Sequence, residues 1–192
     1  MNNTDLIKLN EAFALANTLH KDQKRKGNSV SYISHLMRVS GLVMEYGGTV
    51  DESISALLHD ILEDQGDKIT PIDISNSFGN TVHDIVIECS DSLTPNKEEK
   101  EDWLTRKQKY IAKIATKSAG GKLVMAADKL DNIRITLADY RRIGDLVWDR
   151  FNCTKEQSQW YYTSILEELK KSGFSNSIMI ELEKEIKDFS KL

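Results

Sequence analysis

Apolar side chains recur at helical spacing along almost all of this 192-residue chain, and no other feature restricts its fold as strongly. Positions three and four apart lie on one face of an α-helix, so such a series marks the side that packs against a core. Two clear series are Leu6, Leu9, Phe13, Ala16 and Leu19, then Ile33, Leu36, Met37, Ser40 and Val43. No segment alternates apolar and polar residues as a half-buried strand does. The sequence therefore predicts an all-α fold.

Glycine, proline and capping residues predict where individual helices begin and end. Gly47-Gly48 should end one helix, Thr49 or Asp51 should cap the next, and Thr70-Pro71 should open a short helix. Further along the chain we expect a long charged helix, a break at two glycines and a mostly apolar helix, at residues 97–117, Gly120-Gly121 and residues 123–140.

The composition is that of a folded globular protein, with 40% apolar and 29% charged residues. A chain of 192 residues suits one domain rather than two. We expect residues 1–172 to form that domain, and residues 173–192 to add an accessory helix packed on it. A monomer and a homodimer are both compatible with this sequence.

Charge, hydropathy and cysteine usage exclude several classes of function. The net charge is −4, so the chain lacks the global basic field of a nucleic-acid-binding protein. No apolar run has the length of a membrane span, and the N-terminal MNNTDLIKLN lacks the pattern of a signal peptide. Cys89 and Cys153 form no CxxC pair, which favours reduced thiols. We expect a cytoplasmic protein that binds neither nucleic acid nor membrane.

The stretch SALLHDILED, residues 55–64, places four ionisable groups at the end of an apolar helix. Positions four apart share a helix face, so His59 would lie above Glu63, and Asp60 above Asp64. These groups would repel one another or lack partners if they were buried alone. A bound cation would resolve that conflict. The alternative is an acidic helix end that is simply solvated.

Two other apolar segments supply further metal ligands. His35 interrupts an apolar helical stripe, and Asp128 follows the apolar run LVMAA, with Asn132 four residues later. The candidate ligands are His35, His59, Asp60 and Asp128. Two nitrogen and two oxygen ligands suit Mn²⁺, Fe²⁺, Zn²⁺ or Ni²⁺. Glu63 and Asp64 would then be free to orient or deprotonate a water molecule. A histidine on an apolar face is, alternatively, an ordinary core residue.

Taken in order, these motifs resemble a known family. The succession of His35, His59-Asp60 and Asp128 is similar to the pattern of the HD-domain metal phosphohydrolases. Closer resemblance is to Rel/Spo-type (p)ppGpp hydrolases, above all the stand-alone small alarmone hydrolases. It is carried by RKG and YISHL (residues 25–27 and 32–36), ALLHDILED (56–64) and ADKLDN (127–132). The resemblance extends over roughly residues 8 to 170 and implies a single HD-domain helical bundle.

The resemblance also implies a metal centre and a pair of catalytic residues. The implied ligands of one Mn²⁺-like ion, with Fe²⁺ or Zn²⁺ as alternatives, are His35, His59, Asp60 and Asp128. Glu63 and Asp64 would handle the nucleophilic water. His20 and His83 match no ligand of the family, and we interpret both as ordinary helix residues.

By the same resemblance, Arg25 would stack on a guanine base, Lys26 would lie near the substrate and Asn132 would contact the nucleotide. On sequence alone, the basic run around Arg25 is instead typical of a solvated turn. The expected reaction removes the 3′-pyrophosphate from (p)ppGpp, giving GDP or GTP. The alternatives are hydrolysis of another nucleotide (ppApp, NADPH or a nucleoside monophosphate) and a nucleotide-binding sensor without turnover. Ser31 stands where the family usually has proline, which we expect to loosen the loop after Gly27.

Overall fold

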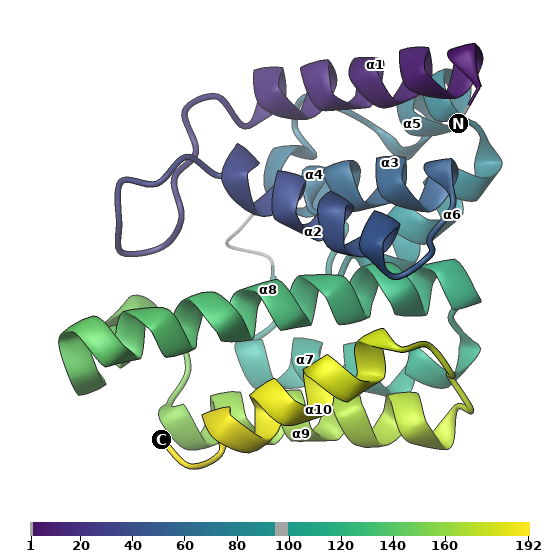
Figure 1. Cartoon of the computed structure of the whole chain (residues 1–192). Coiled ribbons are helices and arrows are strands. Elements are labelled where there is room, and N and C mark those ends of the chain that lie inside the picture. The colour runs from purple at the N-terminus through teal and green to yellow at the C-terminus, as the bar shows by residue number, and fades with distance from the viewer. Residues whose placement is uncertain (1, 95–99) are drawn as a thin grey trace.

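The computed structural model describes residues 2–94 and 100–192, and these residues form helices joined by turns and loops (Figure 1). The α-helices are α1 (Asn3–Leu19), α2 (Ile33–Glu45), α3 (Val50–Leu58), α4 (Ile61–Gln65), α5 (Pro71–Phe78), α6 (Asn80–Cys89), α7 (Trp103–Ala112), α8 (Ala119–Ile143), α9 (Lys155–Lys171) and α10 (Ile178–Phe189). The 3₁₀ helices η2 (Ile114–Thr116) and η3 (Gly144–Arg150) flank α8. Within the described ranges, the only β pairing is an isolated bridge between Lys24 and Ser31. The predicted all-α class is confirmed.

Helix α8 crosses the middle of the molecule between two groups of helices (Figure 1). Helices α1 to α6 lie on one side, around a core that includes Leu36, Ile54 and Ile74. Helices α7, α9 and α10 lie on the other side, where Ile165 of α9 and Leu130 of α8 belong to one hydrophobic core cluster. Because α8 contacts both groups, it is buried along much of its length and can present polar side chains to the space between them.

The predicted end of α2 and the predicted starts of α3 and α5 are confirmed. Gly47, two residues after α2, has φ +81°, a left-handed conformation that glycine adopts without strain. Thr49 caps α3 in a reciprocal capping box with Glu52. Thr70 caps α5 in the same way, and Pro71 occupies its first turn. These ends follow from local side-chain chemistry, which the sequence displays directly.

The SALLHDILED segment does not form the single helix that we expected. Helix α3 ends at Leu58 and α4 begins at Ile61, so His59 and Asp60 form a junction between two helices. In a continuous helix, the Ala56 carbonyl would accept a hydrogen bond from the Asp60 N–H. Here the Nδ1–H of His59 donates to that carbonyl at 2.8 Å. The imidazole therefore replaces the backbone donor, and the chain turns at the two residues predicted to bind metal.

Gly120 and Gly121 do not break the chain, as we had predicted, but lie in the first turn of α8. The helix begins at Ala119, after the Ser118 N-cap. A β-carbon at Gly120 would collide with the side chains of Glu52 and Ile85, and one at Gly121 would collide with the Glu88 carboxylate. The two glycines therefore permit close packing of α8 against α3 and α6, a requirement that only the tertiary structure reveals.

The charged helix predicted over residues 97–117 is shorter than expected. Residues 97–99 lie outside the described residues, and α7 begins at Trp103 because Asp102 caps it by accepting the N–H of Thr105 at 3.0 Å. The helix ends at Ala112, and η2 continues the chain toward α8. Tyr110 of α7 and Ile114 of η2 are buried.

Helix α10 packs against α8 and α9, and its Ile178, Leu182, Ile186 and Phe189 side chains belong to the same hydrophobic cluster as α8. The division at residue 172 into a domain and an accessory helix stays a prediction. No helix of the described residues combines the length and apolar character needed to cross a membrane. The cytoplasmic location and the monomeric or homodimeric state likewise stay predictions.

Candidate metal centre and active site

The four predicted metal ligands lie together where α2, the α3–α4 junction and α8 meet. The Nε2 atom of His59 lies 3.0 Å from Asp60 Oδ2, and the Nε2 atom of His35 lies 3.2 Å from Asp128 Oδ1. The two other nitrogen-to-oxygen distances are 3.8 Å from His35 Nε2 to Asp60 Oδ2 and 3.6 Å from His59 Nε2 to Asp128 Oδ1. Donors at right angles around an ion, with bonds of about 2.1 Å, lie about 3.0 Å apart. His35, His59 and Asp128 each offer one ligand atom, and these three atoms lie within 4.8 Å of one another, a spacing that one shared ion can bridge. Asp60 lies beside His59 but is not part of that group, so its binding to the same ion stays a prediction.

Hydrogen bonds at Nδ1 orient both imidazoles toward this centre. The Nδ1–H of His35 donates to Asp131 Oδ2 at 2.6 Å, as that of His59 donates to the Ala56 carbonyl. When the proton of each ring is on Nδ1 alone, the lone pair lies on Nε2, which is the form that binds a metal ion. Burial lowers the pKa of His59, but Asp60 and Asp128 raise it well above its usual value, so a metal ion would have to displace a proton from its Nε2. Both Nε2 atoms are buried, and neither has a hydrogen-bond partner among residues 2–94 and 100–192. Two such nitrogens beside two carboxylates form a donor set that fits a divalent metal.

Asp131 supports this centre, although the sequence gave us no reason to single it out. It is 3% exposed and accepts, besides the His35 bond, hydrogen bonds from Arg38 Nε at 2.5 Å and Arg38 Nη2 at 3.2 Å. Asp131 follows Asp128 by three residues on α8, and Arg38 follows His35 by three residues on α2. Residues three apart share a helix face, so Asp131 and Arg38 lie on the faces of α8 and α2 that pack against each other. That spacing is the signal by which the pair could have been found.

The carboxylates of Asp60 and Asp128 have partners of their own. Tyr32 Oη donates to Asp60 Oδ2 at 2.5 Å, while Lys129 Nζ and Asn132 Nδ2 donate to Asp128 at 2.6 Å and 2.5 Å. Burial opposes ionisation of Asp128, but the charge of Lys129 outweighs it and holds the pKa well below its usual range. The pKa of Asp60 is likewise lowered against burial, by the positive charge of the adjacent His59 ring in its protonated form. Both groups are therefore anionic at neutral pH.

Glu63 and Asp64, the predicted catalytic pair, lie in α4 just after Asp60. Together with Asp60 they line a cavity beside the metal centre. Burial, with added repulsion from Asp91 and Asp60, raises the pKa of Glu63 to about 7. Burial and Asp60 also raise the pKa of Asp64, although a hydrogen bond from Gln23 Nε2, at 2.7 Å, opposes the rise. A carboxyl group with a pKa near 7 can take up and return a proton at neutral pH, as a general base must.

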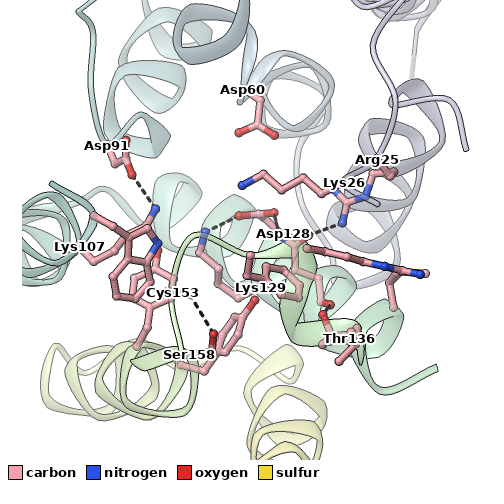
Figure 2. Close-up of a pocket in the computed structure, with 18 of the residues that line it drawn as sticks. Arg25, Lys26, Asp60, Asp91, Lys107, Asp128, Lys129, Thr136, Cys153 and Ser158 are labelled. Atoms are coloured by element: carbon pink, nitrogen blue, oxygen red, sulfur yellow. Dashed lines mark hydrogen bonds and ion pairs between the residues drawn. The ribbon is translucent and has the colours of Figure 1, made fainter. Parts of the chain in front are cut away.

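A cavity of about 320 Å³ adjoins the metal centre. Positively charged side chains line it from the loop before α2, from α7 and from α8. Figure 2 shows three of them, Lys26, Lys107 and Lys129, around one space with Asp128. Lys107 is held there by Asp91 at 2.6 Å. Aromatic rings complete the lining: Tyr32, Trp103, Tyr110, Trp148, Phe151, Tyr161, Tyr162 and Phe189. Cations together with aromatic rings suit an anionic ligand that carries a planar ring system.

The three predicted substrate-binding residues, Arg25, Lys26 and Asn132, all line this cavity. Arg25 Nη2 donates to Asn132 Oδ1 at 2.6 Å, and its guanidinium group lies 5.6 Å from the centre of the Tyr32 ring. The side chain that we expected to stack on a base thus stacks on a protein ring here. Asn132 joins it to the metal centre, because the same amide donates to Asp128.

The loop that carries Arg25 is closed by two backbone hydrogen bonds, from Arg25 N–H to the Val30 carbonyl at 2.9 Å and from Tyr32 N–H to the Gln23 carbonyl at 3.0 Å. Neither bond uses the N–H of Ser31. These two bonds would therefore be available with proline as well, and whether serine at this position loosens the loop stays a prediction.

The HD domain family matches residues 12–146 of this chain. Among curated proteins, the Drosophila melanogaster guanosine-3′,5′-bis(diphosphate) 3′-pyrophosphohydrolase MESH1 is 33% identical over 130 residues, which cover 66% of this chain and 68% of that protein. The Xenopus tropicalis protein of the same name is 31% identical over 179 residues, which cover 92% of this chain and 90% of that protein.

Two solved structures share the fold. One, described as a metazoan ortholog of SpoT that hydrolyses ppGpp, has a TM-score of 0.76 at 24% identity and covers 96% of this chain and 97% of its own. The other is the Listeria monocytogenes protein lmo0812, with a TM-score of 0.70 at 26% identity, covering 82% of this chain and 99% of its own. The family match spans most of this chain, and the similarity to the Xenopus protein spans nearly all of it. The chain therefore belongs to the HD domain family, and the MESH1 pyrophosphohydrolases are among its relatives.

Proposed function

We propose that this protein is a metal-dependent pyrophosphohydrolase that removes the 3′-pyrophosphate from guanosine-3′,5′-bis(diphosphate), or from the corresponding pentaphosphate, to give GDP or GTP. The observation that carries the proposal is the meeting of nitrogen and oxygen donors with a partly buried Glu63 at the edge of a cationic cavity. The MESH1 relatives, which are named for this activity, support the choice of substrate.

The donors that would hold the metal are His35, His59, Asp60 and Asp128. Mn²⁺ is our first choice, with Fe²⁺ and Zn²⁺ as alternatives that the same imidazole and carboxylate ligands accept. A bound divalent ion would supply Lewis-acid polarisation of a phosphoryl oxygen and lower the pKa of water.

Within this site Glu63 accepts a proton from the attacking water, and Asp64 orients that water. The water oxygen bonds to the phosphorus attached to the ribose 3′-oxygen, and the bond between that phosphorus and the 3′-oxygen breaks. The 3′-oxygen takes up a proton, and pyrophosphate leaves with the oxygen of the water. Lys107 and Lys129, both lining the cavity, offset the charge that develops on the phosphoryl group.

The nucleoside end of the substrate lies along the loop before α2. Arg25 leaves Tyr32 or widens its stack to cover the base, since a guanidinium plane stacks well on aromatic rings. Lys26 approaches the phosphates as a point charge. Asn132 offers both a donor and an acceptor to the ribose or a phosphate.

The test is metal-dependent turnover by chelator-stripped protein given Mn²⁺ and, separately, ppGpp, pppGpp, ppApp, NADPH and a deoxynucleoside monophosphate. Phosphate and pyrophosphate release are followed independently. We expect pyrophosphate release from ppGpp, which should be lost in His59→Ala and retained in His83→Ala. His83 is a partly exposed histidine of α6 that pairs with Asp84 and does not line the cavity. Release of phosphate from another nucleotide would overturn the substrate assignment. Metal and nucleotide binding without any turnover would overturn the enzymatic function in favour of a sensor.

A further inference from the structure

His20, which we predicted to be an ordinary helix residue, lies behind the active site, on the far side of Tyr32 from Asp60. It is the C-cap residue of α1 and is 1% exposed. Its ring stacks on Tyr32, with centroids 5.2 Å apart and planes inclined by 22°, and Tyr32 in turn donates to Asp60. The Nδ1–H of His20 donates to Gln23 Oε1 at 2.7 Å. This histidine is therefore joined to the site on two sides.

Gln23 connects His20 to Asp64. Its Nε2 donates to Asp64 Oδ2 at 2.7 Å, and its Oε1 accepts from His20 Nδ1–H and from Gln65 Nε2 at 2.9 Å. Gln65 is held in that orientation because Lys68 Nζ donates to its Oε1 at 2.7 Å. A primary amide donates only from nitrogen, so two donors at its oxygen end force its nitrogen toward Asp64.

The tautomer of His20 is part of this arrangement. Its Nε2 atom is buried and has no hydrogen-bond partner in the part of the chain that the structure describes. A proton on Nε2 would therefore gain no bond, whereas a proton on Nδ1 is bonded to Gln23. With the opposite tautomer, the Nδ1 lone pair would face the Gln23 oxygen, and the amide would turn that oxygen toward the Asp64 carboxylate. Two acceptors would then meet without a proton between them.

We propose that His20 and Gln23 are positioning residues that hold the Asp64 carboxylate in the orientation needed to align the attacking water. The inference rests on the proposed hydrolase function, in which Asp64 orients that water. Neither side chain needs to touch the substrate or the metal. Their effect is transmitted by the two hydrogen bonds that lead from the imidazole through the amide to the carboxylate.

The test compares two amide replacements of His20. The amide nitrogen of Asn can occupy the place of imidazole Nδ1, whereas that of Gln lies one bond further out, near the place of Nε2. We expect His20→Asn to keep kcat within about threefold of the wild type, and His20→Gln to lower it about tenfold or more, as does Gln23→Leu. KM and Mn²⁺ affinity should stay unchanged in all three variants. His83→Gln, the same substitution at the partly exposed histidine of α6, is the matched control.

Equal kcat values in His20→Asn and His20→Gln would overturn the proposal, and so would a parallel loss of metal affinity, which would mark a purely structural role. A second readout does not need turnover. The side-chain amide resonances of Gln23 in the metal-free protein should shift in His20→Gln and stay near wild type in His20→Asn. If wild-type protein hydrolyses no ppGpp, the proposed function fails. The hydrogen-bonded relay is tested separately: unchanged Gln23 amide resonances in His20→Gln would refute it, whatever the activity.

Discussion

Asp131→Asn should weaken metal binding, although Asp131 is not itself a predicted ligand. The carboxylate accepts three N–H groups: Nδ1 of His35 on Oδ2, Nε of Arg38 on Oδ1 and Nη2 of Arg38 on Oδ2. Asparagine has the same size but only one acceptor oxygen. Whichever way its amide lies, an NH₂ group must face either the imidazole or the guanidinium, so a donor meets a donor. If the NH₂ group faces the imidazole, the ring of His35 loses the hydrogen bond that orients it. If the amide oxygen faces the imidazole, the ring keeps that bond but loses the neighbouring carboxylate charge, which makes Nε2 a stronger ligand.

Supporting residues of this kind typically contribute 10- to 100-fold in metal affinity, which corresponds to about 1.4–2.7 kcal/mol. Calorimetric titration of chelator-stripped protein with Mn²⁺ measures this directly, and thermal unfolding of the metal-free protein checks that the variant folds. The exposed Asp149, changed to Asn, provides a matched control. An Mn²⁺ affinity of folded Asp131→Asn within twofold of the wild type would refute the reasoning.

Three further outcomes are expected. Glu63 must be ionised to accept a proton, so kcat should fall as the pH drops through about 7. A bound metal ion lowers the pKa of Glu63 and moves this fall to slightly lower pH. The pH–rate profile measures the fall, and a flat profile would contradict the role of Glu63. Arg25→Ala should raise KM for the nucleotide about tenfold without changing Mn²⁺ affinity. The control is Lys21→Ala, which removes an exposed positive charge and should leave KM unchanged; an equal rise in KM would mean that net charge alone is responsible. Gly121→Ala should destabilise the fold by about 1–3 kcal/mol because its methyl group meets the Glu88 carboxylate, while Gly41→Ala, with open space around the new β-carbon, should not lower the melting temperature.

Local chemistry and tertiary packing contributed differently to the helix boundaries. Thr49, Thr70 and Pro71 mark helix starts through bonds or steric limits within a few residues, so the sequence predicts them correctly. Glycine is ambiguous in this respect. Gly47 ends a helix through its left-handed φ, whereas Gly121 lies in the first turn of one, where Glu88 of α6 occupies the space of a side chain. The difference lies in a neighbour 33 positions away along the printed sequence, which no local rule considers.

The sequence by itself determined which residue types would gather at the site. Polar groups such as His35 and Asp128, set into apolar helical stripes, must find a common partner when those stripes pack, and they do converge. Only the tertiary structure decided which side chains orient them. The bond from His35 to Asp131 joins residues 96 positions apart, and Gln23 reaches Asp64 across 41. Such pairs depend on the rotation and height at which two helices meet, and side-chain packing across the whole core sets those quantities.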